Sequence, residues 1–441
     1  MEKQAIQTFE EAVQYLYDMP RFTTKNTPED TRAHLEKLGS PDKQIPSIIH
    51  VAGTNGKGSV CAYLRYILEE NGARVATFTS PHLVDIRERF CVNGQMMSKE
   101  AFLRIFLQVY ESLDWTALAQ NAGYHPTFFE YLFFMGMLWF GEQKTDYCIL
   151  ETGLGGRLDA TNAVSHKELT VITRIGLDHV EYLGDTIEKV AGEKAGIMKA
   201  GVPLVYCDEV KEASAVFVGR ARDLQIQAYP VSKSDYTLLK FNNKTIDFSV
   251  QTRYYGYIGI TLHTLARYQM ENASIAVRSA EILTGPDGLT VKQIQAGLSK
   301  AFWPGRMEEV LPEVYVDGAH NADGIRAFLD AVAGDGCEAA EQKRFLLFSV
   351  VQDKDYESMI NQVLDAALFD RIYVAHMATG RAMALESLKS LWCANENCPE
   401  ITFDETVQEA LARALSDRTD ARIYIAGSLY LVGEKIGRAH V

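Results

Sequence analysis

A short apolar run, a glycine-rich turn and an amphipathic stretch together limit most strongly what this chain can fold into. Residues 48–51 (IIHV) precede the segment AGTNGKGS at 52–59, and apolar residues at helical spacing follow over 60–68. A strand that ends in such a turn and opens a helix directs several backbone N–H groups toward one point, where the helix dipole adds positive potential. With Lys57 in the turn, the pattern predicts a phosphate-binding loop and a chain that handles a nucleoside triphosphate.

The spacing of this loop differs from the general P-loop pattern. In G-x-x-x-x-G-K-[ST] the hydroxyl residue directly follows the lysine, whereas Gly58 separates Lys57 from Ser59 in this chain. The alternative is a glycine-rich turn that only lets a strand and a helix pack closely. The lysine and serine inside the loop, together with the preceding strand, favour a phosphate site over this packing role.

Composition and charge exclude several other classes of function. With 441 residues, the chain is expected to form two or three domains. A net charge of −14 without a basic stripe argues against nucleic-acid binding. The longest apolar stretch, 128–140, contains Glu130 and is too short to span a bilayer. Scattered cysteines and an N-terminus without a signal-peptide pattern predict a cytoplasmic protein, which we expect to be a monomer.

Alternating strand-like and helical runs predict two α/β domains. The strand-like runs of the first series lie at 47–52, 74–79, 146–151, 169–175 and 202–206, and those of the second at 314–316, 345–351, 371–375 and 422–426. Such alternation is typical of parallel sheets covered by helices. Residues 225–262 predict a β-hairpin inserted on the first core. Because 301–306 breaks the periodicity, we predict a P-loop parallel-sheet ATPase domain over 1–300 and a smaller Rossmann-like α/β domain over 301–441.

The ends of two predicted strands carry side chains suited to a metal ion. Glu151 ends one strand-like run, and His179 follows the next. Ligands of open parallel sheets collect beyond the carboxyl ends of the strands, and Mg²⁺ prefers oxygen ligands. The alternatives are a solvated glutamate and a histidine hydrogen-bonded in the core. Lys194, in the helical run 186–199, lies either on a solvated face or close to phosphate or metal.

Seven motifs in a fixed order make the chain resemble a known family. They are GTNGKGS at 53–59, TSPHL at 79–83, ETGLGGRLDATN at 151–162, LDH at 177–179, EKAG at 193–196, PGR at 304–306 and DGAHN at 317–321. The chain resembles the folylpolyglutamate synthases, including the bifunctional dihydrofolate synthase form, within the Mur-ligase-like ATP-dependent amide ligases. The resemblance extends from about residue 45 to Ser428.

The resemblance implies a role for each matching residue near ATP. The residues that would contact ATP are Gly53, Thr54, Asn55, Gly56, Lys57, Gly58, Ser59, Asn272, Arg306 and Asp317. Lys57 would bind the terminal phosphates, and His320 would lie with Asp317 at the cleft between the domains. The resemblance also implies that Mg²⁺ is coordinated by Ser80, Glu151 and His179. Lys194 matches a lysine that family members carry as a carbamate, which would make it an anionic oxygen ligand.

The resemblance further implies the reaction and its substrates. Thr127 and Asp159 match positions that contact the pterin in bifunctional members, and Phe128 with Phe129 would supply a stacking surface. Ser428 would lie on the amino-acid side. The implied reaction joins the carboxylate of a folate, or of dihydropteroate, to the amine of L-glutamate. ATP would activate the carboxylate as an acyl phosphate, and Mg²⁺, Lys57 and Arg306 would stabilise charge on the transferring phosphoryl group.

The chain departs from the family pattern at one place, and two other functions are open to it. Family members commonly have Gly-x-His-Gln before the asparagine that Asn272 matches, whereas this chain has Ala-Arg-Tyr-Gln at 266–269. The histidine contact is therefore not expected. A Mur-type cell-wall ligase would need a further N-terminal domain, and only about 45 residues precede the P-loop strand. A P-loop ATPase without ligase activity is the second alternative.

Overall fold

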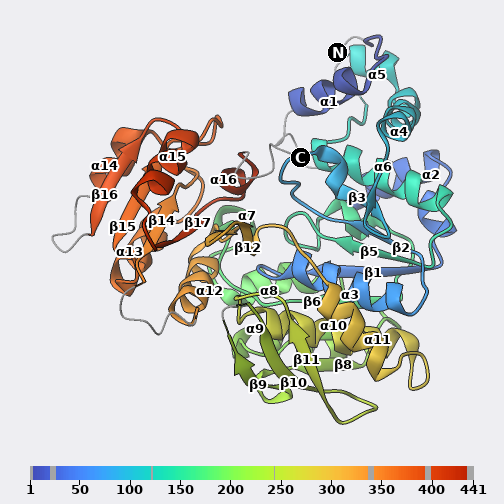
Figure 1. Cartoon of the computed structure of the whole chain (residues 1–441). Helices are drawn as coiled ribbons and strands as arrows, with labels where there is room; N and C mark the ends of the chain where they lie inside the picture. The colour runs from blue at the N-terminus through green and yellow to red at the C-terminus, as the bar shows by residue number, and fades with distance from the viewer. Residues whose placement is uncertain are drawn as a thin grey trace.

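Three sheets organise the protein. The computed structural model describes residues 3–19, 26–120, 123–242, 244–335, 342–392 and 399–434. Within these ranges the sheets have eight, three and six strands. Figure 1 shows the six-stranded sheet of the C-terminal half beside the two sheets of the N-terminal half.

The eight-stranded sheet confirms the predicted parallel α/β core. Its order is β4-β3-β2-β5-β1-β6-β7-β8, with antiparallel pairing only at β2–β3 and β3–β4. The strands are β1 (Ser47–Ala52), β2 (Val75–Phe78), β3 (Phe90–Val92), β4 (Gln95–Met96), β5 (Tyr147–Glu151), β6 (Leu169–Ile172), β7 (Leu204–Cys207) and β8 (Ala228–Val231). The five predicted strands form its parallel centre, and their nearly continuous burial is typical of a sheet covered on both faces.

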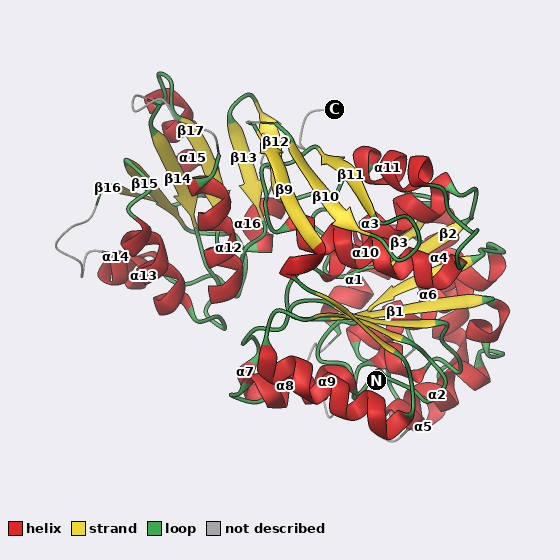
Figure 2. Cartoon of the chain, turned by 90° about the horizontal axis from the view of Figure 1, so that it is seen from below, coloured by secondary structure: helices red, strands yellow, loops and turns green. Residues whose placement is uncertain are grey.

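Alternate side chains of the central strands build separate cores on the two faces of this sheet. Ile48 packs on the side of α1, α2, α4 and α6, whereas Ile49 and Val51 pack on the side of α3, α10 and α11. Figure 2 shows α3 and α10 on one side of the sheet and α8 and α9 on the other. The helices are α1 (Phe9–Asp18), α2 (Pro28–Lys37), α3 (Lys57–Glu70), α4 (Lys99–Ser112), α5 (Trp115–Ala119), α6 (Phe128–Glu142), α7 (Val180–Leu183), α8 (Ile187–Ala195), α9 (Lys211–Leu224), α10 (Gln269–Thr284) and α11 (Val291–Lys300), with short 3₁₀ turns at Pro41–Gln44, Ile86–Arg89, Ala160–Ala163 and Lys233–Asp235.

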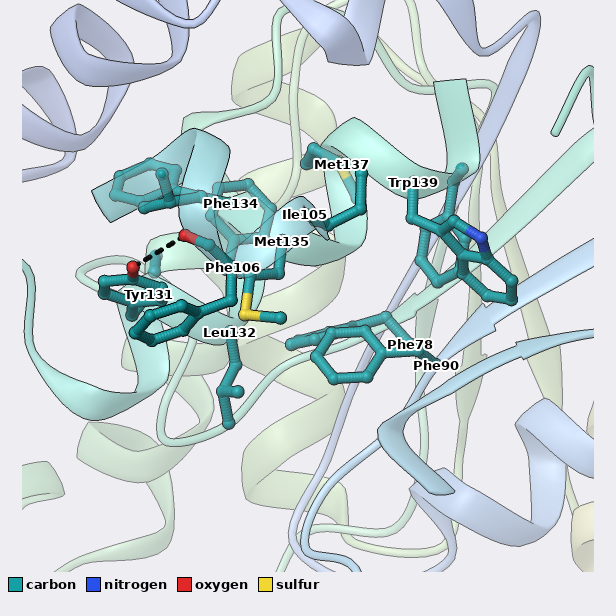
Figure 3. Packing of buried hydrophobic residues seen from close by; sticks show 14 of the residues in the cluster. Phe78, Phe90, Ile105, Phe106, Tyr131, Leu132, Phe134, Met135, Met137 and Trp139 are labelled. Carbon is teal, nitrogen blue, oxygen red and sulfur yellow. Dashed lines mark hydrogen bonds between the residues drawn. The ribbon is translucent and has the colours of Figure 1, made fainter. Parts of the chain in front are cut away.

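The apolar stretch 128–140 forms most of the buried helix α6. Its aromatic and methionine side chains pack between β2, β3 and α4 (Figure 3). The hydroxyl of Tyr131 donates to the backbone oxygen of Phe106 at 2.9 Å, so the one polar atom of this ring has a partner inside the core. At the start of the helix, Thr127 and Glu130 form a capping box, which places the charge of Glu130 at the positive end of the helix dipole.

The predicted hairpin is present and gains a third strand. Strands β9 (Tyr236–Phe241), β10 (Ile246–Gln251) and β11 (Tyr257–Leu262) pair antiparallel, and the buried face of β10 and β11 packs on α10 and α11. In the turn, Asn242 Oδ1 accepts hydrogen bonds from the backbone N–H groups of Lys244 and Thr245. Asn243, also part of the predicted turn, lies outside the described residues.

The C-terminal half forms a six-stranded, mostly parallel sheet in the order β12-β13-β17-β14-β15-β16. Its elements are β12 (Arg306–Leu311), β13 (Val314–Asp317), α12 (Ala322–Ala333), β14 (Arg344–Phe348), α13 (Tyr356–Ala366), β15 (Arg371–Ala375), α14 (Leu385–Trp392), β16 (Glu400–Asp404), α15 (Val407–Asp417), β17 (Arg422–Ala426) and α16 (Leu429–Gly433). The sequence missed the edge strands β12 and β16, whose half-exposed residues lack a long apolar run. The division at residue 300 stays a prediction.

Strand β6 is shorter than predicted, because the residues after it contact the phosphate loop. The run 169–175 was expected to be one strand, but β6 ends at Ile172. Beyond it, the hydroxyl of Thr173 donates to the backbone oxygen of Asn55 at 2.7 Å, so this segment leaves the sheet to hold the loop after β1. Among the described residues, no helix is both long and apolar enough to cross a membrane.

The packing of α6 predicts a large loss of stability on truncation of its core face. Replacing the fully buried Phe134 by alanine should lower the free energy of unfolding by about 3–5 kcal/mol, because it leaves a cavity. Chemical denaturation measures this change. Leu239→Ala, at a side chain that is 63% exposed on β9, is the matched control and should change stability by less than about 0.5 kcal/mol. Equal effects of the two variants would contradict the described core.

Candidate functional site

The two halves of the chain meet at a pocket of about 220 Å³ beyond the carboxyl ends of the central strands. The N-terminal half contributes the loops after β1, β2, β5 and β6, Lys194 of α8 and the start of α10, and the C-terminal half contributes the start of β12, the end of β13 and the start of α12. All seven residues of the loop 53–59 line the pocket. So do the other residues predicted to contact ATP or metal: Ser80, Glu151, His179, Lys194, Asn272, Arg306, Asp317 and His320.

Glycines let the loop after β1 follow a path that other residues would block. Gly53 has φ 151°, and a Cβ there would lie 1.8 Å from Oγ1 of Thr173. Gly56 has φ 90° and is the N-cap of α3, where a Cβ would lie 2.3 Å from Oδ1 of Asn272. At both positions the neighbouring side chain, Thr173 or Asn272, leaves no room for a Cβ, so only glycine fits there.

The loop is also fixed by hydrogen bonds to the segment after β6. The backbone N–H groups of Thr54 and Asn55 donate to the backbone oxygen of Arg174, at 2.9 and 3.3 Å. The hydroxyl of Thr54 donates to the backbone oxygen of Gly176 at 2.9 Å. The first N–H groups of a helix have no intrahelical acceptor, and no side chain caps α3 at Gly56. The first turn of α3 therefore presents N–H groups to the pocket from a rigid support.

Two lysines donate to the same backbone oxygen of this loop. Nζ of Lys57 lies 3.0 Å from the oxygen of Gly53 and 3.2 Å from that of Thr54. Nζ of Lys194, from α8, lies 2.9 Å from the oxygen of Gly53. Burial and the nearby Lys57 lower the pKa of Lys194 to about 7. The pocket thus brings two basic groups together, and the lowered pKa gives Lys194 an uncharged fraction near neutral pH.

Glu151 is one of the buried carboxylates that line the pocket. It ends β5, and its Oε2 accepts a hydrogen bond from the backbone N–H of Ser80 at 2.9 Å. Burial raises the pKa of Glu151, and the positive charge of Lys57 partly opposes this effect. His179 lines the same pocket, and burial lowers its pKa to about 4 and keeps the ring neutral. A neutral imidazole and a carboxylate are both able to ligate a metal.

The donor set fits a magnesium ion held partly by phosphate. Within the described residues, no group of three or more His, Cys, Asp or Glu side chains forms a metal cage. Mg²⁺ seldom uses such cages, because it usually takes one or two carboxylates and fills its shell with substrate phosphates and water. A buried carboxylate beside a phosphate-type loop, with Ser80 and His179 lining the same pocket, matches that requirement.

Asp317 is fixed by three hydrogen bonds at the end of β13. Its Oδ2 accepts from the hydroxyl of Tyr268 at 2.6 Å and from the backbone N–H of Met307 at 3.0 Å. Its Oδ1 accepts from the backbone N–H of Ala319 at 2.8 Å. Burial raises the pKa of Asp317, while Arg306 favours its charged form. Tyr268 stands where family members carry the histidine, and its bond to Asp317 joins the two halves of the chain.

The start of α10 lies against the phosphate loop. Nδ2 of Asn272 donates to Oε1 of Gln269 at 2.9 Å, and Nε2 of Gln269 donates to the hydroxyl of Ser59 at 3.2 Å. His320 lies on the opposite, C-terminal side of the pocket, with Nδ1 2.8 Å from the backbone oxygen of Gly318. Burial and Lys354 lower the pKa of His320 to about 4, so this ring is also neutral.

The four residues predicted to bind the substrates do not line this pocket. Thr127 caps α6, and Ser428 caps α16 by accepting from the backbone N–H of Tyr430. The carboxylate of Asp159 is buried and accepts from its own loop, at the N–H groups of Gly153 and Leu154. These contacts give the three side chains structural tasks, and their substrate contacts stay predictions.

Phe128 belongs to an aromatic group near this pocket. Its ring stacks on that of Tyr17, with centroids 6.0 Å apart, and the guanidinium of Arg89 lies 5.6 Å from its centroid. Arg89 also donates to His82, which contacts the hydroxyl of Tyr17. The neighbouring Phe129 packs on the backbone of a lining residue, Gly153, where a Cβ would lie 2.7 Å from the ring. The aromatic group therefore adjoins the loop after β5.

Sequence reasoning missed two polar contacts around Asp178. Nζ of Lys354 donates to Oδ1 of Asp178 at 2.6 Å, and Nδ2 of Asn321 donates to Oδ2 at 3.0 Å. Burial alone would raise the pKa of Asp178, but Lys354 and the two neighbouring histidines hold it well below its usual range. Asp178 and Asn321 lie inside recognised motifs, whereas no sequence signal identifies Lys354.

Comparison with known families and proteins places these features in context. A profile of the Mur ligase middle domain matches residues 51–280, and one of the Mur ligase glutamate ligase domain matches residues 305–429. The chain is 34% identical to a dihydrofolate synthase/folylpolyglutamate synthase of Bacillus subtilis, over 97% of this chain and 98% of the relative. It is 30% identical to a folylpolyglutamate synthase of Lacticaseibacillus casei, with 96% of each chain covered.

Solved structures give the same result for the fold. Mycobacterium tuberculosis folylpolyglutamate synthase complexed with ADP superposes with a TM-score of 0.86 and 27% identity, covering 96% of both chains. Escherichia coli FolC in complex with DHPP and ADP superposes with a TM-score of 0.82 and 26% identity, covering 98% of this chain and 97% of that one. Both similar proteins therefore bind an adenine nucleotide in the same overall fold.

The geometry of the loop predicts a selective loss of nucleotide binding on substitution of Gly53. In Gly53→Ala the added Cβ would meet Thr173, so the loop must move, and affinity for ADP should fall by about 10²-fold, since it depends on placed N–H groups. Isothermal titration calorimetry measures this affinity. The control is Gly219→Ala on α9, where nothing lies within 4 Å of the new atom and affinity should not change. Unaltered ADP binding by Gly53→Ala would contradict the assignment of the loop.

Proposed function

Because the chain belongs to the Mur ligase family and matches folylpolyglutamate and dihydrofolate synthases over nearly its whole length, we propose that it is an ATP-dependent amide ligase. It adds L-glutamate to a folate, and ATP becomes ADP and phosphate. The observation that carries this proposal is the pocket between the two halves, where a phosphate-type loop meets a buried carboxylate and the C-terminal residues Arg306 and His320.

The reaction must first turn a carboxylate into a good acyl donor. A carboxylate oxygen of the folate attacks the terminal phosphorus of ATP, the bond between that phosphorus and the bridging oxygen breaks, and ADP leaves. The amine of glutamate then attacks the acyl carbon of the acyl phosphate, forms the C–N bond and loses a proton. Expulsion of phosphate from the tetrahedral intermediate completes the amide. This chemistry needs alignment and charge stabilisation more than a protein nucleophile.

The loop residues supply that alignment and charge. The N–H groups at the start of α3 bind phosphate oxygens, and Lys57 moves from the loop carbonyls to the terminal phosphates. Arg306, which reaches the pocket from the C-terminal half, stabilises negative charge on the transferring group. Asn272 and Asp317 contact the nucleoside, and the second half of the chain excludes water from the acyl phosphate.

Ser80, Glu151 and His179 would hold the magnesium ion. When bound, Mg²⁺ neutralises charge on the phosphates that the enzyme aligns. The pKa of Glu151 is raised by burial in its absence, and a cation would favour the charged carboxylate. The hydrogen bond from Ser80 N–H already orients this carboxylate toward the pocket.

Lys194 carries a carbamate in the proposed working enzyme. An uncharged amine adds to carbon dioxide, forming an N–C bond and releasing one proton, so the ammonium form does not react. With its pKa lowered to about 7, Lys194 has an uncharged fraction at neutral pH that an ordinary lysine lacks. The carbamate would exchange a buried positive charge beside Lys57 for an anionic oxygen ligand.

The acyl donor, the folate or dihydropteroate, binds on the side of α6. Phe128 supplies a stacking surface for the pterin or its aromatic extension, beside Thr127 and Asp159. Ser428 serves the glutamate side. Dihydropteroate is a second substrate candidate, since one similar protein carries both synthase names. In this proposal the enzyme is a cytoplasmic monomer that binds neither nucleic acid nor a membrane.

The two alternative functions have less support. A Mur-type cell-wall ligase would share the profiles, but the relatives that match this chain end to end carry folate-ligase names. A P-loop ATPase without a ligase activity would not require Lys194 and Glu151 to face the same pocket from different elements. The dependence of ADP release on folate or dihydropteroate and on glutamate distinguishes the proposed ligase from both alternatives.

Coupled turnover is the experiment that tests the function. ADP release should require an acyl donor, either tetrahydrofolate or dihydropteroate, together with L-glutamate, because only then is the acyl phosphate consumed productively. Lys57→Met should lower kcat/KM by about 10²–10³-fold, as expected on loss of a charge that stabilises the transferring phosphoryl group. Lys211→Met, at an exposed position on α9, is the control. ADP release that ignores folate and glutamate would contradict the ligase and support the ATPase.

The carbamate predicts a defined pH dependence. As the pH falls below about 7, Lys194 becomes protonated, so the carbamate should be lost and activity should fall, and added bicarbonate should shift this loss to lower pH. Isotope-labelled bicarbonate and NMR detect the modification directly. Lys189→Ala, at an exposed lysine of the same helix, should keep the signal, whereas Lys194→Ala should lose it. An unmodified Lys194 in bicarbonate-saturated enzyme would contradict this role.

A further inference from the structure

A basic side chain of the C-terminal half reaches the loop after β6, outside the contacts proposed for ATP and folate. Lys354 lies between β14 and α13, and its Nζ donates to Oδ1 of Asp178 at 2.6 Å. The same Nζ lies 3.4 Å from Nε2 of His179. Only 7% of the Lys354 side chain and 11% of the Asp178 side chain are exposed, so this ion pair is largely removed from water.

A second C-terminal residue holds the other oxygen of Asp178. Nδ2 of Asn321, the N-cap of α12, donates to Oδ2 of Asp178 at 3.0 Å and to Oδ1 of Asn55 at 3.1 Å. In return, Nδ2 of Asn55 donates to Oδ1 of Asn321 at 3.3 Å. Asn55 belongs to the phosphate loop. We call Lys354, Asp178, Asn321 and Asn55 the interdomain clasp.

Oδ1 of Asp178 connects the clasp to His179, a candidate metal ligand. Oδ1 of Asp178, which accepts from Lys354, also accepts from the backbone N–H of His179 at 2.9 Å. His179 has φ 51°, in the left-handed region, so its backbone needs local support to keep that conformation. The hydrogen bond from its N–H provides such support, and Lys354 fixes the carboxylate that accepts it.

Every contact between members of the clasp joins the two halves of the chain. Lys354 and Asp178 are 176 residues apart in sequence, and Asn321 and Asn55 are 266 apart. These bonds therefore exist only while the C-terminal half lies against the N-terminal half. If the halves separate, water can solvate Asp178 and Lys354, whereas removal of Lys354 alone leaves a buried carboxylate without its cation.

We propose that Lys354 is a positioning residue that makes placement of His179 and of the phosphate loop depend on closure of the two halves. In the described part of the chain Lys354 does not line the pocket, and Asp178, at 2.6 Å, is a nearer polar partner than His179, at 3.4 Å, so Lys354 acts mainly through Asp178. This inference rests on the proposed ligase function. It implies that nucleotide alone binds to the loop, while efficient phosphoryl transfer requires the clasp.

The first test compares three variants of the full-length enzyme. Lys354→Met removes the charge at similar length, and Lys354→Arg keeps it. Lys389→Met removes an exposed lysine of α14 that forms an ion pair with Glu386 of the same helix, and serves as the control. We expect Lys354→Met to lower kcat by about 10²-fold, as for a displaced reacting group, with KM for ATP changed by less than about threefold. Lys354→Arg should recover most of kcat, and Lys389→Met should match the wild type.

A double-mutant cycle tests whether Lys354 acts through Asp178. In the Asp178→Asn background, Lys354→Met should cause little further loss of kcat, because its partner is already absent. If the two losses instead multiply, Lys354 acts on something other than Asp178 and the proposal is overturned.

Small-angle X-ray scattering gives a readout that needs no turnover. With AMPPCP and Mg²⁺ present, we expect the wild type and Lys389→Met to be closed. Lys354→Met should then have a larger radius of gyration than either of them. Equal scattering of all three proteins would overturn the clasp, even if turnover falls. If the wild type fails to join glutamate to folate while Lys354→Met still opens, the ligase function is wrong and the clasp is retained.

Discussion

Two lysines donate to one backbone oxygen at the end of β1, and the chemistry of the pocket depends on this buried positive charge. Lys57 and Lys194 both reach the oxygen of Gly53, and burial disfavours two neighbouring ammonium groups. That cost is relieved in two ways. Triphosphate compensates Lys57, and the lowered pKa of Lys194 favours its uncharged form. The pocket is thus organised for a negatively charged substrate.

The phosphate loop is held within the N-terminal half, whereas other hydrogen bonds of the site join the two halves. Hydrogen bonds from the phosphate loop to Arg174 and Gly176 fix the loop on the central sheet. By contrast, Tyr268 with Asp317 and Lys354 with Asp178 are bonds between the halves. An acyl phosphate is sensitive to water, so assembling the last charged groups only on closure protects the intermediate.

Local signals in the sequence predicted the elements that carry the site. The phosphate loop, the strand that ends at Glu151 and the helix that holds Lys194 follow from periodicity and glycine placement, and the resemblance assigned their roles. The sequence did not reveal that β6 would end at Ile172, because the hydroxyl of Thr173 is used by a loop more than 100 residues earlier. Lys354 was also missed, since a single lysine after a strand has no distinguishing spacing. Edge strands β12 and β16 lacked the apolar run that marks buried strands.

The central claim is that the pocket between the halves activates a folate carboxylate with the terminal phosphate of ATP. Transfer of heavy oxygen tests it most directly. A folate whose reacting carboxylate carries heavy oxygen is incubated with ATP and L-glutamate, and the released phosphate is analysed by mass spectrometry. The account predicts that one heavy oxygen appears in each phosphate released during amide formation. Phosphate that contains only solvent and ATP oxygen, while amide still forms, would contradict it.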